Sequence, residues 1–91
     1  MPCYLITYDL NKETTRPPIV DKIKEIANGW AKLSESSYAI NHAGSPQGVY
    51  NLLKPMLDSN DSLLVIPMHK PYYGQNSKAV IEWLDKSLPI K

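Results

Sequence analysis

The residue with the clearest chemical potential is Asp9, which ends the apolar stretch Cys3–Asp9. Mg²⁺ and Mn²⁺ take oxygen ligands, and Mg²⁺ needs only one or two carboxylates because it keeps several waters. Sites are often built where a rigid element gives way to a loop. Asp9 is therefore a candidate metal ligand and catalytic residue. The structural alternative is a solvated strand end or a cap of the following loop.

Two serines, Ser36 and Ser37, are the second set of catalytic candidates. They lie in the middle of residues 30–41, and their hydroxyl groups could bind a phosphate or orient a water molecule near Asp9. That role requires the strands around them to lie beside the strand that carries Asp9. The alternative is a turn or bulge in which the serines make local backbone bonds.

Four residues are predicted to contact nucleic acid: Lys12, Arg16, Lys70 and Tyr72. Basic side chains bind phosphates, and aromatic rings such as those of Tyr72 and its neighbour Tyr73 stack on bases. The alternative is that both tyrosines pack against the last helix.

Three other groups of polar residues are predicted to have no metal-binding role. His42 and His69 stand in separate loops without a Cys or His at ligand spacing, which argues against zinc, although either imidazole is a candidate general acid or base. Residues 58–61 read Asp-Ser-Asn-Asp, an ordinary turn sequence. The single cysteine, Cys3, is predicted to be an inert packing residue.

The elements that must position these residues follow the order strand, helix, strand, strand, helix, strand, helix. Alternating side chains in Cys3–Asp9 are apolar on both faces, which predicts a central strand. Residues 30–41 divide into two strands around the serines, and Ser62–Met68 is the fourth strand. Pro67 places that strand at a sheet edge because proline has no N–H for a ladder.

Capping signals and apolar spacing define the helices. The first begins after Thr14 or Thr15 as its N-cap, with Pro17 and Pro18 in its first turn and an apolar stripe over residues 19–27, and it ends with Gly29 at the C′ position. The second begins at Ser45 and carries apolar residues to position 57, with a kink at Pro55. Asn76 or Ser77 caps a short final helix.

This order predicts an α+β protein with one domain over residues 1–91: a ferredoxin-like βαββαβ sandwich with an extra C-terminal helix. The first and third strands are central in that arrangement, and both main helices cover one sheet face. The opposite face carries Cys3, Leu5 and Thr7 and is predicted to stay uncovered within one chain. Because monomers rarely expose such a patch, we expect a homodimer.

Composition sets further limits. The 91 residues are 43% hydrophobic and 21% charged, with a net charge of +1. This is typical of a soluble globular protein and gives no strong electrostatic indication of nucleic acid or membrane binding. The single cysteine fits a reducing compartment. The lack of a signal peptide and of a long apolar run predicts a cytoplasmic protein that makes no membrane contact.

Three short stretches resemble a known superfamily. They are Tyr8-Asp9-Leu10 at the end of the first strand, the Ser-rich residues 35–38, and residues 60–65, which open the fourth strand. Over about residues 3–68 the chain is similar to the small ferredoxin-like CRISPR-associated proteins of the spacer-integration complex and to the VapD ribonucleases. It looks closest to a bacterial and phage branch of that superfamily.

The resemblance implies a symmetric dimer in which Asp9 meets its copy near the two-fold axis and the pair holds Mg²⁺ or Mn²⁺. It implies a metal-dependent endonuclease that cleaves RNA or DNA. Where the family often has a second acidic residue this chain has Asn11, and Arg16 stands alone before two prolines. Two alternatives stay open: a non-catalytic dimeric scaffold that binds nucleic acid or a protein partner, and a phage or mobile-element accessory protein that acts on a host factor.

Overall fold

The structure is a computed structural model that describes residues 1–10 and 16–90, with the backbone only at residues 16 and 17. The predicted threonine cap and Lys12 lie outside the described residues. The strands are β1 (Cys3–Asp9), β2 (Gly29–Ser34), β3 (Ser37–Asn41) and β4 (Ser62–Met68). The helices are α1 (Arg16–Ile26), α2 (Pro46–Leu53), the short 3₁₀ helix η2 (Lys54–Met56) and α3 (Lys78–Ser87).

The described strands form one antiparallel sheet in the order β2-β3-β1-β4. β1 and β3 are central, as predicted, and β4 lies at an edge, as Pro67 indicated. Ile6 in β1 is opposite Tyr38 in β3 and Val65 in β4. This α+β arrangement is compatible with a ferredoxin-like fold.

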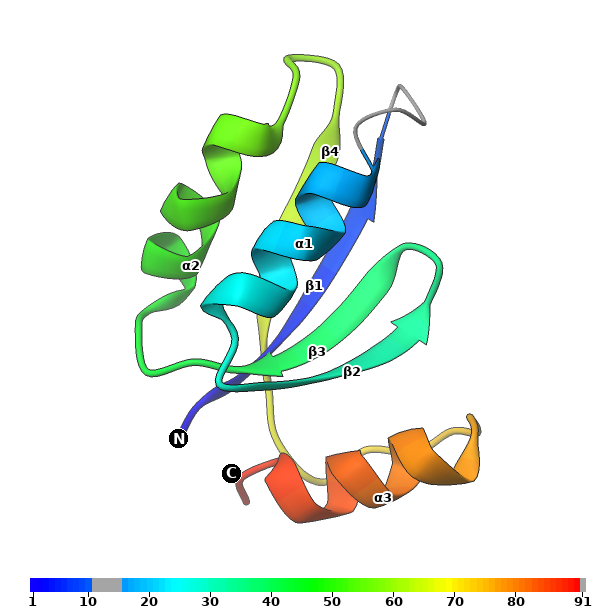
Figure 1. Cartoon of the computed structure of the whole chain (residues 1–91). Coiled ribbons are helices and arrows are strands. Elements are labelled where there is room, and N and C mark those ends of the chain that lie inside the picture. The colour runs from blue at the N-terminus through cyan, green and yellow to red at the C-terminus, as the bar shows by residue number, and fades with distance from the viewer. Residues whose placement is uncertain (11–15, 91) are drawn as a thin grey trace.

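The main core lies between the sheet and the two helices α1 and α2, which cover the same face (Figure 1). The alternation of β1 sends Tyr4, Ile6 and Tyr8 to this face, and all three are buried. The apolar stripes of α1 and α2 pack against them. Their fully buried members are Ile19, Ile23, Val49 and Leu53.

The opposite face differs from the prediction, because α3 covers part of it (Figure 1). Cys3 is 2% exposed and Ala39 is fully buried, in a cluster with Val80, Leu84 and Leu88 from α3 and its C-terminal cap. The prediction that this face is uncovered within one chain is therefore wrong at Cys3. The reason is that the chain after β4 returns across the sheet. The prediction considered only the two main helices as cover for the sheet and left out the final helix.

The other half of this face stays open and forms an apolar strip of Leu5, Leu64 and Ile66. Leu64 is 61% exposed and Ile66 is 41% exposed, while Leu5 is half-buried between them and β3. This strip runs along β1 and β4, away from β2, the strand against which α3 packs. A surface that could be covered by another molecule therefore remains, although it is smaller than predicted.

Serine side chains cap the N-termini of two helices. The Ser45 hydroxyl accepts a hydrogen bond from the Gly48 N–H at 3.0 Å, which confirms the predicted cap of α2. Ser77 caps α3 by accepting from the Val80 N–H at 3.3 Å. The choice between Asn76 and Ser77 is thus decided for Ser77.

Two predicted helix ends are different in the structure. Gly29 is not a helix cap, because α1 ends at Ile26 and Gly29 is the first residue of β2. It does not have a positive φ, so the freedom of glycine to adopt that conformation is not used there. The α-helical part of α2 ends at Leu53, and Pro55 lies in the 3₁₀ turn that follows. Proline lacks an N–H for the helical hydrogen bond, and its ring clashes with the carbonyl group one turn earlier in an α-helix. The α-helix therefore does not continue through Pro55.

Candidate functional site

Asp9 lies at the end of β1, with its residue exposed to solvent. It is opposite Ser62, the first residue of β4. Thr7 precedes it on the same face, which is the face of the apolar strip. A hollow of about 190 Å³ is bordered by residues 7–9 and 62–64. The carboxylate therefore stands at one end of the apolar strip, beside two hydroxyl-bearing residues.

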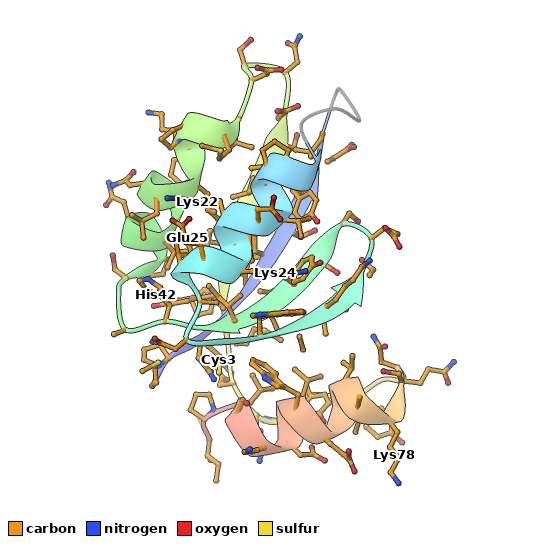
Figure 2. The ribbon with its side chains drawn as sticks, viewed as in Figure 1. Cys3, Lys22, Lys24, Glu25, His42 and Lys78 are labelled. Atoms are coloured by element: carbon orange, nitrogen blue, oxygen red, sulfur yellow. The ribbon has the colours of Figure 1, made fainter. Side chains whose placement is uncertain are left out.

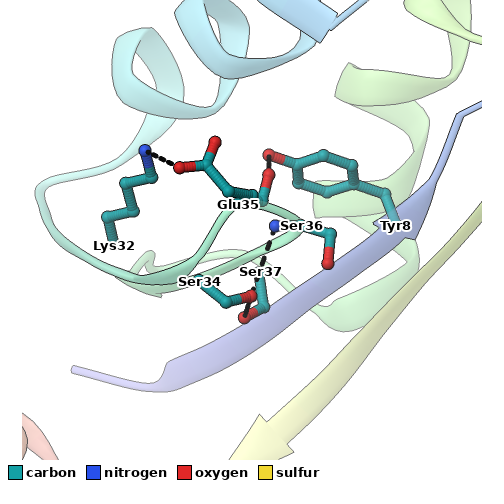
Figure 3. Close-up of polar contacts among 6 residues, drawn as sticks. All are labelled: Tyr8, Lys32, Ser34, Glu35, Ser36 and Ser37. Carbon is teal, nitrogen blue, oxygen red and sulfur yellow. Dashed lines mark hydrogen bonds and ion pairs between the residues drawn. The ribbon is translucent and has the colours of Figure 1, made fainter. Parts of the chain in front are cut away.

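The predicted proximity of the two serines to Asp9 is confirmed at the level of the backbone. Ser37 is opposite Thr7 in the sheet, and the Tyr8 N–H donates to the Ser36 carbonyl at 3.0 Å. The turn between β2 and β3 thus lies beside the end of β1 (Figure 3). Antiparallel pairing of β1 with β3 brings the three candidate catalytic residues to one end of the sheet.

The hydroxyl groups in this turn also make local bonds, as the structural alternative proposed. The Ser34 and Ser37 hydroxyls are 2.7 Å apart and share a hydrogen bond, and the Ser36 N–H donates to Ser34 Oγ at 3.2 Å. The Tyr8 hydroxyl donates to the Glu35 carbonyl at 3.2 Å (Figure 3). A β-bulge between Lys32 and Ser34 precedes the turn. The serine bonds stabilise the turn itself, and the two bonds from Tyr8 hold it against β1.

Two of the predicted nucleic-acid contacts are far from Asp9. Met68 is opposite Cys3 whereas Ser62 is opposite Asp9, so the segment after β4 leaves from the other end of the sheet. The seven residues of β1 span about 20 Å. Lys70 and Tyr72, which follow β4, are therefore not brought to the Asp9 end within one chain.

Both residues are instead bound to α3. Lys70 Nζ donates to the Asp85 carbonyl at 2.6 Å, and the Tyr72 hydroxyl donates to Asp85 Oδ1 at 2.6 Å. The hydrogen bond to this carboxylate raises the pKa of Tyr72, with burial and the Asp85 charge acting in the same direction. Tyr73 is fully exposed. Lys12 and the side chain of Arg16 lie outside what the structure describes.

The histidines and the aspartate turn make local contacts. His42 Nδ1 accepts from the Gly44 N–H at 2.9 Å, and His69 Nδ1 is 3.1 Å from the Lys70 carbonyl. Asp61 Oδ2 accepts from the Asp58 N–H at 2.8 Å, as expected of a turn. Within residues 1–10 and 16–90, no group of three or more His, Cys, Asp or Glu side chains is placed to hold a metal ion.

A larger hollow, of about 430 Å³, was not found from the sequence. It lies at the end of the sheet opposite Asp9, and its lining includes Met1, Tyr4, Pro46, Pro67, His69 and Ile90. These residues come from both chain ends, the end of β4 and the start of α2. No local pattern connects such segments, so no sequence signal could have indicated the hollow.

Cys3 also borders this hollow, between the sheet and α3 (Figure 2). Its thiol donates to Asn41 Oδ1 at 2.7 Å and is 3.0 Å from the Ser87 carbonyl. Burial raises the pKa of the thiol, partly offset by the positive charge of the chain's amino terminus. A buried thiol with a raised pKa is a poor nucleophile.

Comparison with known proteins supports the fold. No family model matches the sequence. No curated protein matches it either. Among solved structures, a hypothetical protein from Thermus thermophilus is similar, with a TM-score of 0.62 and 16% sequence identity. The match covers 84% of this chain and 92% of that protein. At this identity the similarity shows a shared fold and nothing about activity.

No helix in the described ranges is long and apolar enough to cross a bilayer.

Proposed function

We propose that this protein has a ferredoxin-like fold and acts as a homodimeric, metal-dependent endonuclease in which Asp9 binds Mg²⁺ or Mn²⁺. The observation that supports this most is the position of Asp9, an exposed carboxylate at the end of an exposed apolar strip. Water-exposed Leu64 and Ile66 favour a second molecule on this surface. The carboxylate at its end would then lie at the border of the interface.

The symmetry of a dimer supplies a second carboxylate beside the one that the described residues place at this site. If a two-fold axis passes near the end of the strip, Asp9 and the partner's Asp9 face each other. Oxygen donors are what Mg²⁺ prefers, and one or two carboxylates with waters suffice. Thr7 and Ser62 border the same hollow and add hydroxyl oxygens. The donor set of this end of the sheet therefore fits a hard divalent cation.

The bound cation would supply Lewis-acid stabilisation of a phosphodiester and a more acidic water. The chain's own part is to hold the carboxylates in position. Asp9 is the last residue of a central strand that is paired on both sides at Thr7. The turn of Ser36 and Ser37 holds the strand end through the Tyr8 N–H. In this proposal these serines position Asp9 by fixing the backbone beside it.

A non-catalytic dimeric scaffold for nucleic acid or a protein partner is the second candidate. The observation that favours the scaffold is the hydrogen bond between the Ser34 and Ser37 hydroxyls. This bond gives Ser37 a structural role in the turn, so its presence there does not require a catalytic role. The relation to CRISPR-associated and VapD proteins, the phage or mobile-element origin and the cytoplasmic location stay predictions.

Metal response separates the two candidates. Two facing Asp9 carboxylates repel each other, and a bound cation relieves the repulsion and stabilises the assembly by linkage. We expect Mg²⁺ or Mn²⁺ to raise the Tm of the wild type and Asp9→Asn to abolish that rise. Cleavage of RNA or DNA should be lost in the same variant. Asp21→Asn, which removes an exposed carboxylate on α1, is the matched control and should behave as wild type.

Cleavage that survives in Asp9→Asn would refute the assignment of Asp9. A wild type that shows neither a metal-dependent Tm nor cleavage would favour the scaffold.

A further inference from the structure

The outer side of β4 is a sheet edge that pairs with no strand among the described residues, and the register shows which of its groups face outward. The Tyr8 N–H bonds to the carbonyl of Ser36, the residue just before β3, so Tyr8 faces the β3 side of β1. The alternate residues of β1, Leu5 and Thr7 among them, therefore direct their N–H and C=O groups toward β4. Leu5 is opposite Ile66, and Thr7 is opposite Leu64. Leu64 and Ile66 are therefore among the β4 residues that direct their N–H and C=O groups toward β1.

It follows that Leu63 and Val65 direct their backbone N–H and C=O groups away from the sheet. The outward stretch is bounded on one side by Pro67, which has no N–H. It is bounded on the other side by Asp61, whose N–H already donates to the Asp58 carbonyl at 3.1 Å. The available donors thus belong to Leu63 and Val65, which are symmetrical about Leu64.

Between Asp61 and Pro67 this edge has neither a charged residue nor a bulge in the described structure, and Pro67 prevents pairing only at one end. β4 reads Ser-Leu-Leu-Val-Ile-Pro-Met and has no charged residue. Sheet edges are normally protected by charges, bulges or covering segments. The other edge strand, β2, has all three: Lys32, the bulge next to it, and Asn76, whose Nδ2 donates to the Leu33 carbonyl at 3.2 Å. The contrast indicates that the two edges have different roles.

We propose that β4 pairs antiparallel with β4 of a second copy, about a two-fold axis at Leu64. In this register Leu63 exchanges hydrogen bonds with the partner's Val65, and the reverse pair follows by symmetry. All the outward N–H groups between Asp61 and Pro67 are then bonded. A second copy fits better than another strand because the edge is uncharged and its free groups are self-complementary, as a two-fold interface requires.

This contact is separate from the Asp9 interface of the proposed function. Asp9 and the partner's Asp9 would be three strand spacings apart across the joined sheet and displaced by four residues along it. With a spacing of about 4.8 Å and a rise of about 3.3 Å, the two residues lie about 20 Å apart. Edge pairing therefore does not form a shared metal site, and neither interface requires the other.

The register can be tested by disulfide trapping. At the axis, Leu64 is opposite its own copy as a non-hydrogen-bonded pair with Cα atoms about 4.5 Å apart, within the range of a disulfide. Leu64→Cys, made in a Cys3→Ser background, should give a covalent dimer on a non-reducing gel after oxidation with copper phenanthroline. Leu64 is mostly exposed, so the variant should fold.

Two neighbouring positions provide the controls. Ser62 would face the partner's Ile66, so Ser62→Cys and Ile66→Cys should not cross-link alone but should do so when mixed. A Leu64→Cys protein that stays monomeric under oxidation would overturn the proposal. So would equal cross-linking of all three single variants, or a mixture of the Ser62 and Ile66 variants that does not cross-link. The metal response of Asp9 is measured independently, so failure of either proposal leaves the other testable.

Discussion

The packing of α3 on the sheet can be tested by truncating Leu84. This side chain is 6% exposed and lies in the cluster with Cys3, Ala39, Val80 and Leu88. Leucine-to-alanine changes in cores cost about 2–5 kcal/mol, from lost transfer free energy plus a residual cavity. Because this cluster is small and close to the surface, its walls can partly collapse, and we expect Leu84→Ala to lower the free energy of unfolding by about 2–3 kcal/mol.

Urea denaturation followed by tryptophan fluorescence and circular dichroism would measure the change. For a domain of this size, about 2–3 kcal/mol corresponds to a fall in Tm of about 10–20 °C. Leu64→Ala is the matched control on the same sheet face. In a monomer it should change stability by less than about 0.5 kcal/mol because Leu64 is mostly exposed. In an assembly that buries Leu64, its cost should grow with protein concentration.

If Leu84→Ala changes the free energy of unfolding by less than about 0.5 kcal/mol, the assignment of Leu84 to a buried cluster is refuted, because substitutions at surface sites give effects of that size. It would mean that α3 does not bury Leu84 against the sheet, and that the whole face opposite α1 and α2 is open.

Two further predictions concern local chemistry. The hydrogen bond to Asp85 raises the pKa of Tyr72 above its usual value of 10.0. The folded state therefore holds this proton more tightly than the unfolded state, and its stabilising effect should be lost as pH rises beyond that value. Tm measured against pH should fall less steeply there in Tyr72→Phe; identical slopes would contradict the assignment. Ser45→Ala removes the acceptor for the Gly48 N–H and should cost about 1 kcal/mol in urea denaturation. Ser59→Ala, at an exposed turn position, should cost almost nothing, and equal losses in the two variants would contradict the cap.

Local sequence signals accounted for most elements. The two-sided apolar pattern of Cys3–Asp9 indicated a central strand, and the structure pairs that strand on both sides. Pro67 indicated an edge, and its position on the outward side of β4 explains why it is tolerated there. The cap at Ser45 could be predicted because it depends on residues that are neighbours in the chain. Helix ends were less accurate: Gly29 suggested a cap but starts a strand.

The candidate site was only partly predictable. The place of Asp9 at a strand end was evident from the sequence, as was the nearness of Ser36 and Ser37. The separation of Lys70 and Tyr72 from Asp9 was decided by the antiparallel register of β1 and β4, which puts Met68 beside Cys3. The sequence could not show that Asp85 would bind both residues.

The sequence by itself determined that both faces of the first strand must be covered by other parts of the protein or by a partner, because the side chains on both faces are mostly apolar. Only the tertiary structure decided what covers the second face. The return of the chain after β4 places Leu84 over Cys3 and leaves Leu64 in solvent. The physical reason is that periodicity identifies an apolar surface but not its partner. That partner is fixed by contacts between segments such as Cys3 and Ser87, which are 84 residues apart in the chain.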